Sequence, residues 1–102
     1  MQLCCESFER LVQNAGMNGF SVVAIQSGNL IGFFLQSRSY DSNQEDKLLN
    51  LPRVSDPPRP FVLVMQTGIR FCPYCGASLE RVIRERRERV AALAVAHRPF
   101  AM

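Results

Sequence analysis

The sequence feature that most restricts the fold is a pair of cysteines separated by two residues, in the run Cys72-Pro73-Tyr74-Cys75-Gly76. Two thiols at this spacing can point at one centre, as a tetrahedral metal site requires. Pro73 fixes φ inside the turn, and Gly76 allows the positive φ that brings backbone N–H groups toward the sulfur atoms. Such a turn supplies half of a four-ligand set. It therefore predicts a metal centre that takes two further ligands from elsewhere in the chain.

The two remaining cysteines, Cys4 and Cys5, lie at the opposite end of the chain. We expect Cys4, Cys5, Cys72 and Cys75 to converge on one zinc ion and so to hold the first residues against the end of the last strand. Four thiolates can also bind iron. Adjacent cysteines reach one ion only if the backbone turns between them. One of the two N-terminal thiols could therefore belong to the core, with His97 as an alternative fourth ligand. A lone His near a helix end is, however, more often an exposed or dipole-stabilised residue than a ligand.

Cys72 and Cys75 have a second interpretation, as a thiol redox pair. A thioredoxin-like pair lies at a strand-to-helix junction in a βαβ setting. A helix is expected after Cys75, but no parallel-sheet pattern precedes the motif. Zinc is therefore the favoured interpretation, and the redox pair is an alternative.

Length and composition bound the class of protein. A chain of 102 residues with 47% hydrophobic residues predicts a single domain, 1–102, with a modest core. Four thiolates around Zn²⁺ would lower the formal charge of +3 to about +1, which is too small to indicate a nucleic-acid partner by itself. The start of the chain lacks a basic region followed by an apolar run, and the longest apolar stretch, 30–35, is too short to span a membrane. We expect a soluble, cytoplasmic protein.

The hydrophobic pattern predicts an α+β fold with a small antiparallel sheet of three or four strands, flanked by a short N-terminal helix and a long C-terminal helix. Apolar residues at helical spacing predict a helix over 4–15, with Glu6, Glu9, Arg10 and Gln13 facing outward. Strands are expected over 20–26 and 30–36, joined by a hairpin turn at 27–29. A glycine inside the second of these, Gly32, marks either a bulge or a close backbone approach.

Two further strands are expected over 61–66 and 69–71, joined by a turn at Thr67-Gly68 that delivers the cysteine motif. Between the two predicted hairpins lies a polar, proline-rich insertion over 37–60. Within this insertion, Ser42 and Glu45 fit a capping box, which predicts a short helix near 43–50. Loops of this length usually have some structure of their own or a function.

The C-terminal helix is expected over 78–97, capped by Ser78 and ended by Pro99. Six residues form its apolar stripe: Leu79, Val82, Ile83, Val90, Leu93 and Ala94. The stripe is long for so small a domain, which suggests a homodimer through this helix. The closing residues from Phe100 onward have no obvious packing partner.

Arginines of the same region are the only candidate for a nucleic-acid contact. The candidate residues are Arg81, Arg84, Arg87 and Arg98. Glutamates interleave with them, so the favoured interpretation is a solvated helix face with ion pairs. Nucleic-acid binding through this helix is an alternative.

Taken together, these motifs carry a resemblance. The pair Cys4-Cys5 followed by Phe8, with the run from Ile69 to Gly76 and then Leu79, resembles a group of small bacterial and bacteriophage proteins. These begin with Cys-Cys-x-x-Phe and finish with an apolar strand, Cys-Pro-aromatic-Cys-Gly and a leucine. They are zinc-knuckle-like and mostly uncharacterised. The resemblance implies four-cysteine zinc binding and a phage or prophage connection. It does not extend to the proline-rich insertion or to the long charged helix.

Apart from the alternative redox pair, the sequence gives little support for catalysis: it has no His-x-Glu beside the cysteines, no His-Glu-x-x-His, no nucleophile elbow and no phosphate loop. A zinc ion with four thiolate ligands has no open position for water, so it would be structural. The sequence therefore favours a non-enzymatic protein in which structural zinc supports a protein-interaction module.

Overall fold

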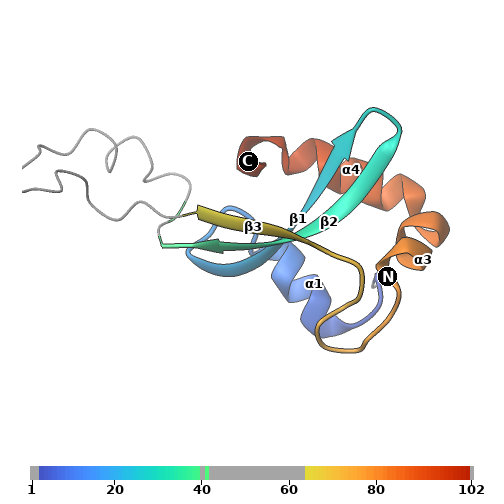
Figure 1. The fold of residues 1–102 in the computed structure, drawn as a ribbon, viewed down its shortest axis with the longest axis horizontal. Helices are drawn as coiled ribbons and strands as arrows, with labels where there is room; N and C mark the ends of the chain where they lie inside the picture. The colour runs from blue at the N-terminus through green and yellow to red at the C-terminus, as the bar shows by residue number, and fades with distance from the viewer. Residues whose placement is uncertain (1–2, 40, 42–63, 102) are drawn as a thin grey trace, which may run out of the picture.

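The computed structural model describes residues 3–39, 41 and 64–101 of the chain. Its elements, in chain order, are α1 (Glu6–Gln13), β1 (Gly19–Ser27), β2 (Leu30–Arg38), β3 (Val64–Ile69), α3 (Leu79–Glu85), α4 (Arg87–Ala96) and the 3₁₀ helix η2 (Arg98–Phe100). The three strands form an antiparallel sheet in the order β1-β2-β3, with helices at both ends of the sequence (Figure 1). The predicted α+β class is confirmed. The capping box and the helix near 43–50 lie outside the described residues.

The β1–β2 hairpin agrees with the sequence. Its last pair is Ser27 opposite Leu30, so the loop contains Gly28 and Asn29. Gly28 has a φ of +62°, and no residue other than glycine has a positive φ among those described. A positive φ at the first loop position only is the pattern of a type II′ turn, whose twist matches that of the flanking strands.

The turn predicted at Thr67-Gly68 is wrong, because both residues lie inside β3. Thr67 pairs with Leu35, and Gly68 pairs with Phe34. A β-carbon on Gly68 would lie 3.5 Å from the ring of Phe34, and one on Gly32 would lie 3.2 Å from the same ring. The two glycines thus leave room for one aromatic ring on this sheet face. Gly32 marks a close approach rather than a bulge, since the β1–β2 register is unbroken.

The core lies on one face of the sheet. Its buried residues are Leu3, Phe8, Val12, Val22, Ala24, Phe33, Cys72, Leu79, Val82, Val90 and Ala94. Phe8 of α1 meets Phe33 of β2 edge to face, with ring centroids 5.2 Å apart at 85°, a geometry worth about 0.5–1.5 kcal/mol beyond the buried area. The apolar stripe of the C-terminal region is therefore used within the chain, because four of its six residues belong to this core.

The continuous helix predicted over 78–97 is interrupted. Arg86 has φ −124° and ψ 37°, and it separates α3 from α4. No Gly or Pro marks the break; tertiary packing explains it. The break lets α3 pack on β2 while α4 turns back along β1 and the hairpin (Figure 1). None of the helices in the described part is long and apolar enough to cross a membrane.

The C-terminal residues do find a packing partner. The ring of Phe100 lies against Gly16, where a β-carbon would come within 2.6 Å of it. The carbonyl of Phe100 accepts hydrogen bonds from Gln36 Nε2 at 2.8 Å and Arg38 Nη2 at 3.2 Å. Gln36 and Arg38 belong to the sheet face opposite the core, and both are buried. The chain end thus covers polar side chains that no sequence pattern links to it.

Candidate metal centre

The N-terminal half of the site is built at the start of α1. Cys5 is the N-cap of this helix, with extended φ and ψ of −152° and 165°, and its Sγ accepts the N–H of Phe8 at 3.4 Å. The carbonyl of Cys5 accepts the N–H of Glu9 at 3.1 Å. An N-cap normally uses a side-chain oxygen. Here a sulfur atom takes that place, and the extended backbone at Cys5 leaves its thiol beside that of Cys4.

The second half is a closed turn between β3 and α3. Backbone hydrogen bonds join Cys72 N to Ala77 O at 2.9 Å and Gly76 N to Cys72 O at 3.0 Å. Gly76 has the positive φ expected of it, +75°. The N–H groups of Tyr74 and Cys75 both point at Cys72 Sγ, each at 3.4 Å. The turn is therefore held in shape by its own backbone.

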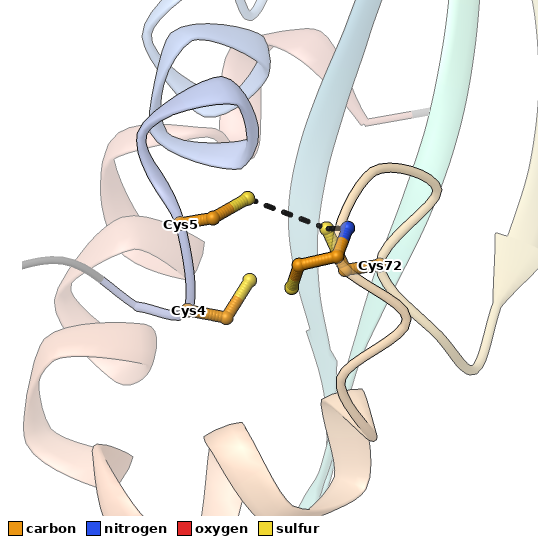
Figure 2. A group of neighbouring side chains, drawn as sticks. Cys4, Cys5 and Cys72 are labelled. Atoms are coloured by element: carbon orange, nitrogen blue, oxygen red, sulfur yellow. Dashed lines mark hydrogen bonds between the residues drawn. The ribbon is translucent and has the colours of Figure 1, made fainter.

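The two halves face each other. The Sγ atoms of Cys4, Cys5, Cys72 and Cys75 all lie within 4.8 Å of one another. Figure 2 shows Cys4 and Cys5 projecting from the start of α1 toward Cys72 on the facing turn. All four are free thiols, and Cys5 Sγ is 3.7 Å from Cys72 Sγ. A tetrahedron with zinc–sulfur bonds of about 2.3 Å has sulfur–sulfur edges of about 3.8 Å. The four cysteines are thus positioned to hold a metal ion.

Burial and crowding set the protonation of these thiols. Burial raises the pKa of Cys4, and the neighbouring thiols of Cys75 and Cys72 raise it further. Burial also raises the pKa of Cys5, although the N–H of Phe8 opposes the shift. Burial alone would raise the pKa of Cys72, but the N–H groups of Cys75 and Tyr74, together with the thiols of Cys75 and Cys4, outweigh it and lower the pKa to about 7. A cation would offset the burial, and the smaller repulsion between thiolates, that keep protons on Cys4 and Cys5.

The site lies at the boundary between core and solvent. Cys72 is buried with 3% of its surface exposed, Cys4 and Cys5 are half-buried, and Cys75 is exposed. An ion could therefore reach the thiols from the side of Cys75. Its inner side would rest on the hydrophobic core.

His97, the alternative fourth ligand, is not part of this cluster. It ends α4 and is buried, and its Nδ1 accepts the backbone N–H of Ala24 at 3.0 Å. The grouping of potential ligands found in the described part of the chain consists of the four cysteines. His97 thus caps an N–H of strand β1 and is not one of the grouped ligands.

The arginines of the nucleic-acid hypothesis are exposed but do not share one helix. Arg81 and Arg84 belong to α3, Arg87 begins α4 and Arg98 lies in η2, beyond the far end of α4. Arg81 is 3.3 Å from Glu85 in an i, i+4 ion pair, as expected of a solvated helix face.

The expectation for Glu9 from the sequence is wrong. Glu9 was expected to face outward, yet only 8% of it is exposed. Its Oε1 accepts the N–H of Leu3 at 3.1 Å, its Oε2 accepts from Arg89 Nη2 at 2.9 Å, and Arg89 Nη1 also contacts Oε1. No sequence signal links Glu9 with an arginine 80 positions later.

No family model matches the chain, and neither a curated protein nor a solved structure matches it significantly.

Proposed function

We propose that the protein is a small zinc-binding protein in which Cys4, Cys5, Cys72 and Cys75 hold one Zn²⁺. The observation that carries this proposal is the convergence of four Sγ atoms within 4.8 Å, with the Cys5–Cys72 pair at 3.7 Å. Adjacent cysteines and a closed Cys-x-x-Cys turn reach this arrangement from opposite ends of the chain. A redox pair would need only two of the four thiols.

The ion would have a structural role. Four thiolates complete a tetrahedral zinc site and leave no position for a water molecule or substrate. When bound, the ion supplies cross-linking: it joins the segment before α1 to the turn after β3. We therefore propose a non-enzymatic protein, in keeping with its resemblance to small bacterial and bacteriophage zinc-knuckle proteins.

A protein-interaction module is the role that we propose for this zinc-stabilised fold. Phe20, Met65 and Tyr74 are each more than half exposed, at 64%, 58% and 63%. Phe20 borders two neighbouring hollows of about 340 and 350 Å³, one shared with Tyr74 and the other with Met65. Large apolar side chains that gather at a surface often mark contacts with proteins.

Elemental analysis of the purified protein tests the zinc proposal. We expect one zinc ion per chain and a lower midpoint of unfolding after chelation. Cys75→Ser should reduce zinc binding, whereas Tyr74→Ala, in the same turn but with all four thiols retained, should keep the stoichiometry. Chains that hold iron would contradict the choice of metal. Metal-free chains with a Cys72–Cys75 disulfide would contradict the proposal and favour the redox interpretation.

A further inference from the structure

We infer that Glu9, held in place by Arg89 of α4, positions the N-terminal thiol pair for metal binding. This inference rests on the proposed zinc function and assigns control of the site to two residues that carry no sulfur. It concerns the short segment of residues 3–5, because Cys4 and Cys5 can share an ion with the turn only when that segment has one conformation.

Both ends of the segment are tied to the first turns of α1. At its start, the Leu3 side chain is buried in the core with 4% exposed, and the Leu3 N–H donates to Glu9 Oε1 at 3.1 Å. At its end, the Cys5 carbonyl accepts the N–H of Glu9 at 3.1 Å, and Cys5 Sγ accepts the N–H of Phe8. Glu9 thus bonds to both ends, through its side chain and through its backbone, and Cys4 lies between them.

The Glu9 carboxylate is itself fixed by α4. A buried carboxylate is costly unless it is paired and hydrogen-bonded. Arg89 meets both carboxylate oxygens with its two Nη atoms, as a guanidinium fork does. This pairing leaves Oε1 in reach of the Leu3 N–H. The position of α4 therefore affects the position of the Cys4 and Cys5 thiols, through Arg89, Glu9 and Leu3.

The other half of the site needs no such support, because Cys72 and Cys75 lie in a turn closed by its own backbone bonds. Loss of the Glu9 carboxylate should therefore act unequally on the two halves. Outer-shell partners of metal ligands typically change affinity about 10–100-fold when replaced. A residue that merely stabilised the fold would loosen all four thiols together.

The test is Glu9→Gln in the full chain. The amide carries no charge and places a donor NH₂ group where one carboxylate oxygen stood, so it cannot keep the Leu3 bond and both Arg89 contacts. We expect zinc affinity, measured by competition with a chromophoric chelator, to fall at least about 10-fold. In the zinc-loaded variant, alkylation mapped by mass spectrometry should reach Cys4 and Cys5 much faster than in wild type, with Cys72 and Cys75 still protected.

Two control variants separate positioning from stability. Glu6→Gln removes an exposed carboxylate of the same helix, 2.8 Å from Arg10, and should change neither readout. Val23→Ala removes a buried side chain on the opposite sheet face, and should raise the reactivity of all four thiols in parallel. Unchanged affinity in Glu9→Gln, or parallel exposure of the four thiols as in Val23→Ala, would overturn the inference alone. A wild-type chain that binds no zinc would overturn the proposed function and the inference together.

Discussion

His97 provides a test of the fold that does not depend on the metal. It is 6% exposed, and its Nδ1 accepts the Ala24 N–H at 3.0 Å, so the folded state requires a neutral ring. Burial lowers the pKa of His97 below its ordinary value of 6.5. Below about pH 6.5, the unfolded chain takes up a proton that the folded chain does not bind. The free energy of unfolding should therefore fall by up to about 1.4 kcal/mol per pH unit until the folded pKa is reached, with no such effect at higher pH.

Two substitutions separate the charge from the hydrogen bond. His97→Asn can place its Oδ1 near the position of Nδ1, so it keeps an acceptor for the Ala24 N–H but does not titrate. We expect it to lose the His97 contribution to the pH slope and, at pH 7.5, to lose mainly the packing of the ring beside Phe100, 6.2 Å away between centroids. His97→Leu fills similar space but leaves the N–H of Ala24 without its acceptor, at a cost of about 1–3 kcal/mol.

Urea unfolding between pH 8 and 5.5 in excess zinc provides the measurement. Protonation of the thiols affects every variant alike, so the difference between wild type and His97→Asn isolates the imidazole. Parallel curves for the two proteins below pH 6.5 would refute a lowered His97 pKa. Zinc content should be the same in both. If His97→Asn lost the ion, His97 would be a ligand after all.

Three further measurements probe the thiols, the core and the polar sheet face. Raised pKa values at Cys4 and Cys5 imply that zinc binding releases at least two protons. The logarithm of the zinc association constant should therefore fall by about two or more for each unit by which the pH is lowered. The association constant should fall more steeply below the Cys72 pKa of about 7. Calorimetry of zinc binding in buffers of different ionisation heat measures the protons released, and a pH-independent affinity would contradict this prediction. Phe8→Ala, at a fully buried position, should lower the free energy of unfolding by about 3–5 kcal/mol; a loss below 1 kcal/mol in denaturant titrations would contradict its place in the core. Ser21→Ala should raise it by about 1 kcal/mol, because Ser21 Oγ is buried without a hydrogen-bond partner among the described residues, and a destabilised variant would reveal a bond there.

Local chemistry explains which parts of the fold could be predicted. The β1–β2 hairpin followed from a β-branched run and an apolar run on either side of a glycine-containing turn, a signal that needs no knowledge of the rest of the chain. Thr67-Gly68 carried a similar signal, yet Gly68 lies inside β3 because the ring of Phe34 needs the space. The break at Arg86 is also tertiary, since α3 packs on β2 whereas α4 packs mainly on β1. In both cases a distant contact overrode a local preference.

The residues of the candidate site also fall into two groups, those that the sequence predicts and those that it does not. Cysteines can be recognised as candidate metal ligands from residue type and spacing, so the four thiols could be named before their positions were known. Glu9 and His97 could not be assigned, because each acts through a backbone N–H: that of Leu3 for Glu9, and that of Ala24 for His97. Side-chain bonds of this kind to backbone groups leave no pattern in a sequence. Glu9 in particular resembles any other polar residue of an amphipathic helix.

The way the two halves are held also bears on how much the ion contributes to folding. Cys5 and Cys72 are 67 positions apart, and a cross-link closing a loop of that size would contribute about 4 kcal/mol if it alone constrained the unfolded chain. In the folded chain the N-terminal segment is already held against the rest of the domain without the ion, through Leu3 in the core and the Glu9–Arg89 pair. The sheet and its Phe8–Phe33 contact need no sulfur atom. Metal loss should therefore loosen residues 3–5 first, because the turn at 70–78 keeps its own backbone bonds, and hydrogen exchange in β1 and β2 should stay slow. Exchange that quickened equally in the strands after chelation would show instead that the ion supports the whole fold.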